Sequence, residues 1–171
     1  MSITMYAAAV PPMIRALGAL AKVLEKGAAF AAARKIDEAV LLNARLAPDM
    51  FALTRQVQIA SDTAKGCAAR LAGLEVPSWP DTETSFAALQ DRLTRTIDYL
   101  GGIAPEQIDG SESRPITLKF RTGEAHFDGI GYLTGFVLPN VYFHCTTAYD
   151  ILRHCGVELG KRDFMGTPVN L

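Results

Sequence analysis

The spacing of apolar residues limits the fold of this chain more than any other feature of its sequence. In four long segments these residues recur every three or four positions, which places them on one face of an α-helix. The segments are residues 4–26, 48–73, 83–100 and 139–154. Met13 and Leu17 illustrate the pattern in the first segment, and Leu89 and Leu93 in the third. Four such helices with connections of medium length predict an all-α four-helix bundle, built as one domain over residues 1–171.

Proline, glycine and aspartate set the expected helix boundaries. Pro11 and Pro12 predict a kink near the start of the first helix, and Gly27 predicts its end. Asp37 can accept a hydrogen bond at the start of a short helix over residues 37–45. We therefore expect a short helix between the first two long ones.

The segment before the last helix has a different pattern. Residues 115–120 alternate apolar and polar side chains, a turn can follow, and residues 125–128 can return. This pattern predicts a small β-hairpin, followed by a short helical turn over residues 129–138. The last helix is predicted to end at Gly156, and the tail after it to be irregular.

Charge and composition exclude several classes of function. The chain has 171 residues and a formal net charge of -1, whereas a protein that binds nucleic acid through phosphates needs a basic surplus. It has no apolar run of about 18 residues, and Pro11-Pro12 interrupts its apolar start, so we expect neither a membrane span nor a signal peptide. Cys67, Cys145 and Cys155 lack C-x-x-C spacing, so no disulfide framework is expected. These features favour a cytoplasmic protein.

Polar side chains beside the apolar stripes are the candidate site residues. On a helical wheel of the last helix, His144 lies at the border of the apolar face that includes Cys145. In the second long helix, Gln58 and Asp62 lie four positions apart, one above the other. In one interpretation, Asp62 forms a solvated ion pair with Lys65, three positions later in the helix. His144 is then a structural histidine whose ring bonds to a neighbouring group. Alternatively, Gln58 and Asp62 can form a polar wall that faces His144, where a carboxylate would orient the imidazole or raise its basicity.

The residues offer little support for a metal centre. Zinc normally takes three or four converging ligands, and the three histidines, His126, His144 and His154, have no H-x-x-x-H or H-E-x-x-H spacing. The Walker A, G-x-G-x-x-G and G-x-S-x-G motifs are absent as well. No cofactor is predicted, and His144 with Asp62 is the weak candidate for a divalent metal.

Two long segments carry a resemblance to a known family. They are RLAPDMFALTRQVQIASDTAKGCAARLAG, residues 45–73, and LPNVYFHCTTAYDILRHCGVELGKRDFMG, residues 138–166. With these segments the chain resembles a bacterial family of domains of unknown function within the DinB/YfiT-like superfamily. The resemblance spans essentially the whole chain, including the predicted hairpin. It implies an up-down four-helix bundle that is often a homodimer.

The resemblance implies less about activity. Many members of that superfamily hold a divalent metal with three histidines, one from the second helix and two from the last, and some are thiol-dependent transferases or hydrolases. Here the second helix, QVQIASDTAKG, has no histidine. Gln58 or Asp62 occupies the region where a ligand would be expected, and on the last helix only His144 is expected to face inward. This departure means that the resemblance alone assigns neither a metal nor a reaction.

Three functions are compatible with these observations. The first is a small-molecule-binding or weakly catalytic bundle, with His144 as general acid or base and Asp62 tuning it. Its pocket would be lined by Gln58, Asp62, Asn140, His144 and Tyr149. The second is a metal-dependent DinB-like transferase or hydrolase with a degenerate ligand set. The third is a non-catalytic interaction protein that forms a homodimer.

Overall fold

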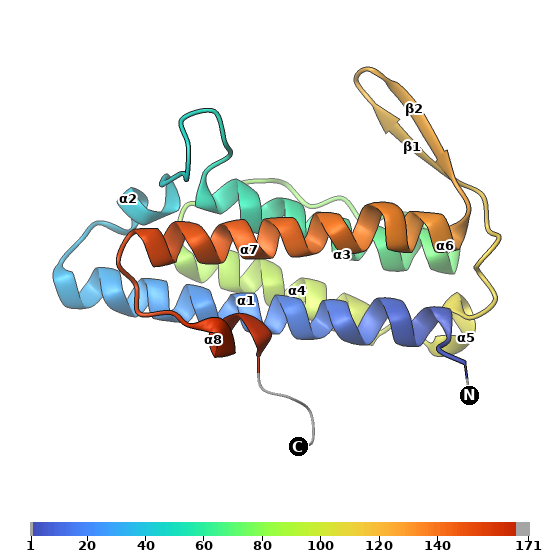
Figure 1. Cartoon of the computed structure of the whole chain (residues 1–171), viewed down its shortest axis with the longest axis horizontal. Coiled ribbons are helices and arrows are strands. Elements are labelled where there is room, and N and C mark those ends of the chain that lie inside the picture. The colour runs from blue at the N-terminus through green and yellow to red at the C-terminus, as the bar shows by residue number, and fades with distance from the viewer. Residues whose placement is uncertain (1, 167–171) are drawn as a thin grey trace.

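The computed structural model describes residues 2–166, and within that range four helices have 16 or more residues. They lie side by side along the molecule (Figure 1). These long helices are α1 (Met5–Arg34), α3 (Leu53–Ala72), α4 (Phe86–Gly101) and α7 (Leu138–His154). The shorter elements are α2 (Glu38–Leu42), α5 (Pro105–Ile108), β1 (Ile116–Phe120), β2 (Gly123–Phe127), α6 (Gly129–Gly131), the π-helix η1 (Tyr132–Val137) and α8 (Lys161–Met165). The predicted mainly helical fold with a small sheet before the last long helix is confirmed, and the described residues form further short helices besides the four long ones.

The core lies where the apolar spacing places it. Met13 and Leu17 of α1 and Leu89 and Leu93 of α4 are each at most 1% exposed. Complete burial of such a side chain contributes about 1.5–3 kcal/mol. The amphipathic stripes therefore account for the packing of the long helices against one another.

The order of the long helices differs from the simple up-down arrangement that the resemblance implied. At one end of the bundle the backbone N–H of Tyr6 donates to Asp109, and at the other end that of Phe86 donates to Glu38. α4 therefore begins beside the start of α3 and runs in the same direction, while α1 and α7 run the opposite way (Figure 1). The chain must therefore return along the bundle from the end of α3 to the start of α4. Residues 73–85 can span this distance, because an extended chain at about 3.3 Å per residue covers the roughly 30 Å length of a 20-residue helix.

The predicted end of the first helix at Gly27 is wrong, because this glycine serves close packing. A Cβ added at Gly27 would lie 3.1 Å from the methyl carbons of Leu152 and 3.2 Å from the ring of Phe86. Helix α1 continues instead to Arg34, and the next residue, Lys35, caps it with a left-handed φ of 55°. Tertiary contact, and not the local tendency of glycine to end helices, explains the residue at this position.

The two prolines near the start of α1 lie inside the helix. The hydroxyl of Thr4 caps the helix by accepting from the N–H of Ala7 at 3.2 Å. Pro11 and Pro12 then lack two backbone donors, yet the helix continues and Met13 beside them is buried. Burial of the apolar face outweighs the two missing hydrogen bonds.

Three predicted helix ends are confirmed. Asp37 accepts from the N–H of Ala39 at 2.9 Å at the start of α2. Gly73 ends α3 with a φ of 70°, and Gly156 follows α7 with a φ of 97°. These positions depend on local backbone chemistry, which the residue type specifies.

The start of the second long helix is later than predicted. Helix α3 begins at Leu53, not at Pro48, and residues 43–52 form an irregular loop. The side chain of Arg45 donates to the carbonyl of Met50 at 2.6 Å across this loop. A side-chain donor thus takes a carbonyl that a longer helix would use.

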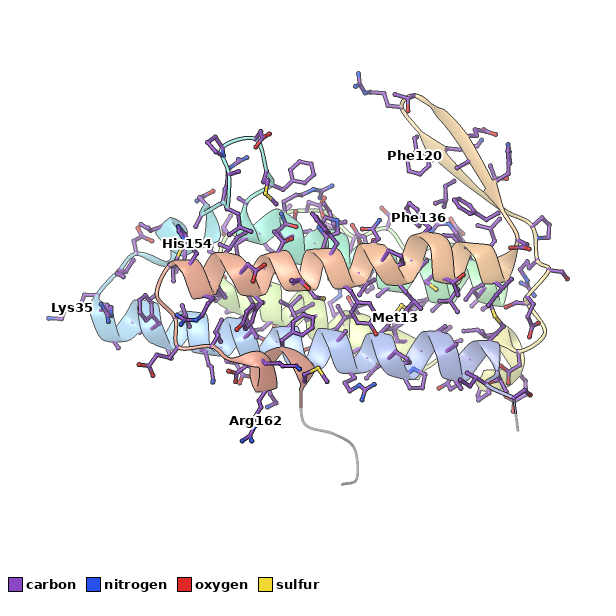
Figure 2. The ribbon with its side chains drawn as sticks, in the orientation of Figure 1. Met13, Lys35, Phe120, Phe136, His154 and Arg162 are labelled. Carbon is purple, nitrogen blue, oxygen red and sulfur yellow. The ribbon has the colours of Figure 1, made fainter. Side chains whose placement is uncertain are left out.

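The predicted hairpin is confirmed. Strands β1 and β2 pair antiparallel, with Ile116 opposite Phe127 and Phe120 opposite Gly123. Phe120 and Phe127 both contact Phe136 of η1, with ring centroids 6.2 Å and 5.9 Å apart. Figure 2 shows Phe120 on the hairpin and Phe136 on the helix below it. These aromatic contacts hold the hairpin to the start of the last long helix.

The helical segment after the hairpin is continuous from Gly129 to His154. Pro139 was expected to restart the helix, but it lies inside this segment. Directly before it, the N–H of Leu138 donates to the carbonyl of Leu133, which is the i→i−5 bond of a π-helix. The wider turn accommodates a proline ring that an ordinary helix interior would exclude.

The tail, predicted to be irregular, contains the short helix α8. Asp163 accepts from the N–H of Gly160 at 2.8 Å and from Nζ of Lys26 at 2.6 Å. These bonds cap α8 and fasten it against α1 (Figure 1). Residues 167–171 lie outside the described part of the chain.

One helix, α1, is long and apolar enough to cross a membrane by the criteria of length and composition. In its most apolar window, 44% of the residues are buried inside the molecule. A core helix of a soluble protein meets the same two criteria, so the finding carries little weight.

Replacing Gly27 with leucine should destabilise the protein by about 1–3 kcal/mol, because the new side chain must displace packed neighbours. Gly18 in the same helix is the matched control, since nothing lies within 4 Å of a Cβ added there. Gly18→Leu should leave the stability unchanged or raise it by up to about 1 kcal/mol. Urea denaturation followed by circular dichroism measures both effects, and equal results at the two positions would contradict close packing at Gly27.

Candidate functional site

A buried arginine on α4 organises the polar side chains between α3 and the loop of residues 73–85. The side chain of Arg92 is 1% exposed. Its guanidinium donates to Asp62 and to Glu83, each at 2.9 Å, and lies 3.0 Å from Asp81. A buried cation is stable only when it is paired in this way.

Two further cations belong to this Arg92 cluster. Lys65 has a side chain that is 4% exposed, donates to Asp62 at 2.8 Å and lies over the ring of Trp79. Arg55 pairs with Asp81. The cluster therefore contains as many cations as carboxylates. The pair of Asp62 with Lys65, which was one of the two sequence interpretations, is present.

Gln58 also belongs to the Arg92 cluster. Its Nε2 donates to Glu83 at 2.8 Å, and its Oε1 accepts from Arg55 at 3.2 Å. Burial alone would raise the pKa of the Glu83 carboxyl, but hydrogen bonds from Arg92 and Gln58 hold it below its ordinary value. Gln58 and Asp62 thus lie in one cluster, and their partners outside α3 come from α4 and the connecting loop.

His144 contacts α3 through a different residue, Gln56. Its Nδ1 lies 2.6 Å from Oε1 of Gln56, and Nε2 of Gln56 donates to the carbonyl of Phe51 at 2.9 Å. Because the amide nitrogen of Gln56 is used by a carbonyl, its oxygen must accept from the imidazole. Nδ1 of His144 therefore carries the hydrogen, and Nε2 keeps its lone pair.

Among the described residues, the second ring nitrogen of His144 is unpaired and not fully buried. The residue is 9% exposed, and Nε2 has no hydrogen-bond partner among residues 2–166. The fully buried polar atoms without a partner in that range are those of Tyr99 and Ser111, so Nε2 is not sealed inside. Burial lowers the pKa of His144, and the charge of Arg55 lowers it further. The imidazole is therefore neutral near pH 7, with one fixed nitrogen and one available nitrogen.

The remaining two candidate residues lie elsewhere on α7. Tyr149 lines a cavity between α1, α7 and α8, where its ring packs edge-on against Phe164 with centroids 6.1 Å apart. Asn140 is half-buried near the start of α7. The five residues expected in one pocket thus occupy separate places: Gln58 and Asp62 in the Arg92 cluster, His144 with Gln56, Tyr149 at the cavity, and Asn140 apart.

Sequence reasoning missed Gln56 and Arg92. Arg92 interrupts an apolar stripe, since it lies three positions after Leu89 and beside Leu93, and a charge in such a place indicates a buried ion pair. Gln56 lies on the opposite flank of α3 from Asp62. Only the position of α7 shows that the flank with Gln56 faces His144.

The residues present do not fit a three-histidine metal centre. Within residues 2–166, no group of three His, Cys, Asp or Glu side chains could hold a metal ion. His126 lies in β2, bonded to Thr117, and His154 lies at the far end of α7 (Figure 2). One turn after His144 stands Ala148, which has no ligand atom. The positive charge of Arg55 beside His144 also opposes a bound cation.

Comparison with known proteins agrees with the fold. A family model described as "Domain of unknown function (DUF1993)" matches residues 5–165. The chain belongs to this family. It is also similar to a crystal structure of a DinB family member from Shewanella denitrificans, with 40% identity and a TM-score of 0.87 over 96% of this chain and 93% of that one. No curated protein matches the chain. The DUF1993 family is thus DinB-like in structure, as the sequence resemblance indicated.

Replacing Glu83 with glutamine should lower stability at pH 7 by about 1–3 kcal/mol, the range for hydrogen bonds to charged groups. Because the folded pKa of Glu83 is lowered, its carboxylate stabilises the fold above the unfolded value of about 4.3. That contribution is lost as the pH falls through the folded pKa. The free energies of unfolding of the two proteins, measured by urea denaturation from pH 7 to pH 3, should therefore converge as the pH falls. A difference in free energy that does not depend on pH would contradict the lowered pKa.

Replacing Gln56 with glutamate should raise the pKa of His144, because a carboxylate beside Nδ1 favours the imidazolium. Imidazole nitrogen shifts measured by NMR across pH give this pKa and also the tautomer, which should be Nδ1–H in the unsubstituted protein. The ring signals of His126 and His154 are internal controls and should not differ between the two proteins. An Nε2–H tautomer at His144 would contradict the assigned orientation of Gln56.

Proposed function

We propose that this DUF1993 protein binds a small molecule beside His144, at the α3–α7 face, and that Nε2 of His144 accepts a hydrogen bond or a proton from it. The matching group on the molecule is a hydroxyl, a thiol or an amine. The observation that carries the proposal is the pairing of Nδ1 with Gln56, which leaves a fixed and solvent-accessible lone pair on Nε2.

The protonation state of His144 supports this role. A general base must be unprotonated at the working pH and within hydrogen-bond reach of the proton it takes. Burial of His144 and the charge of Arg55 both lower its pKa, so the neutral imidazole predominates at pH 7. A lowered pKa makes it a weaker base, which suits the acceptance of a proton from an acidic group such as a thiol.

The surroundings of His144 and Gln56 provide both apolar side chains and positive charge. Phe143 packs edge-on against the imidazole with centroids 5.2 Å apart and is 56% exposed. Phe51, whose carbonyl orients Gln56, is also 56% exposed. Arg55 contributes a positive charge that stabilises a ligand from which a proton has been removed. These neighbours favour a ligand with an apolar part and a weakly acidic group.

Other functions have less support. A metal-dependent transferase or hydrolase needs ligands that the described residues do not bring together. An interaction role without chemistry would not need the free nitrogen of His144. The homodimer and the cytoplasmic location remain predictions, and light scattering at micromolar concentration tests the first of them.

A ligand-detected NMR screen of small thiols, alcohols and amines tests the proposal. Asparagine at position 144 can still offer a donor to Gln56 but removes the second ring nitrogen, so His144→Asn should weaken the best ligand about tenfold. His154→Asn is the matched control on the same helix and should have no effect. Equal binding to both variants, or no ligand for the unsubstituted protein, would contradict a site at His144.

A further inference from the structure

A cavity lies on the side of α7 that faces α1, away from His144 and Gln56. It has a volume of about 270 Å³, just below the range of about 300–1,000 Å³ for ligand pockets. Helices α1, α7 and α8 enclose it, and α8 lies across α1 at this place (Figure 1). Its walls are mainly apolar: Pro12, Ala16, Leu20, Val23, Phe164 and Met165.

Three polar side chains also line this cavity, namely Arg15, Tyr142 and Tyr149. Within residues 2–166, no hydrogen bond or ion pair engages the guanidinium of Arg15 or either phenol hydroxyl. Cys145 lines the cavity as well, but burial raises the pKa of its thiol to about 12. The thiol is therefore a neutral wall group and not a nucleophile, while the arginine and the phenols are available to a ligand.

The charge around the cavity selects the class of ligand. Arg15 and Lys22 lie two turns apart on α1 and share an adjoining hollow, while Lys26, one turn further, is already paired with Asp163. The mouth of the cavity is therefore positive. We propose that the cavity binds an amphipathic monocarboxylate, whose apolar chain fills the space between α1 and α7 and whose carboxylate pairs with Arg15.

Helix α8 acts as the cover of this site. It is held by the Lys26–Asp163 ion pair, whose side chains are 49% and 25% exposed, and by the edge-on contact of Phe164 with Tyr149. Ion pairs as exposed as this one hold weakly. A ligand can enter by displacing α8 and, once bound, offers Phe164 and Met165 an additional apolar surface to cover.

This site is independent of the proposed function. His144 and Cys145 are neighbours in sequence, but His144 faces Gln56 of α3 and Cys145 faces the cavity beside α1. His144→Asn should therefore leave carboxylate binding unchanged. Failure of one proposal can be recognised without reference to the other.

Isothermal titration calorimetry with octanoate tests the proposal, with octanol as the neutral analogue. Arg15→Gln should weaken octanoate about two- to fivefold, as expected for an exposed charge pair, and leave octanol unchanged. Ala16→Phe should fill the cavity and reduce the affinity for both molecules at least tenfold. Arg34→Gln and Ala33→Phe, at exposed positions near the other end of α1, are the matched controls and should bind like the unsubstituted protein.

A second measurement guards against a misfolded variant. In the unsubstituted protein, nuclear Overhauser effects from octanoate to the rings of Tyr149 and Phe164 should place its chain in the cavity, which requires no change to the cavity wall. Circular dichroism should show unchanged helix content in the Ala16 and Arg15 variants. The proposal is overturned by any of three results: no binding of octanoate at millimolar concentration, equal binding by Ala16→Phe, or an unchanged preference for octanoate over octanol in Arg15→Gln.

Discussion

The arrangement of the helices depends on the ion pairs of the buried Arg92 guanidinium. This group joins α3, through Asp62, to the loop of residues 73–85, through Asp81 and Glu83. That loop carries the chain along the length of the bundle, so that α4 can run parallel to α3. Removal of this cation would leave three carboxylates with two cations, and Glu83 would lose its ion-pair partner, which is more costly than the loss of an exposed pair. The cluster thus has a structural role that its polar composition alone would not reveal.

Helix α7 has two faces with different chemistry. On one face, His144 is held by Gln56 of α3 and presents a single nitrogen to solvent. On the other face, Cys145 and Tyr149 line an apolar cavity against α1 and α8. Both features depend on α7 being packed between α1 and α3, so one helix supplies two candidate sites. In this chain an imidazole thus lies between α3 and α7, although the residues around it do not form a three-histidine centre.

Much of the fold could be predicted because its causes are local. The apolar stripes, the cap at Asp37 and the glycine end at Gly73 act over one or two turns of chain. The errors arose where distant residues compete with local preference. Gly27 was expected to end a helix, but Leu152 and Phe86 pack against it from two other helices. The tail was expected to be irregular, but Lys26 of α1 binds Asp163 and fastens α8.

The helical class, the hairpin, the family and the separation of the three histidines follow from the order of residues, because spacing and residue type are properties of the chain. The partners of the polar residues depend instead on how the helices pack. Gln56 and Asp62 lie on opposite flanks of the same stripe, and a helical wheel cannot show which flank meets α7 and which meets α4. A long connection and a buried ion cluster set the direction of α4. As a result Asp62 pairs with Arg92, and His144 bonds to Gln56.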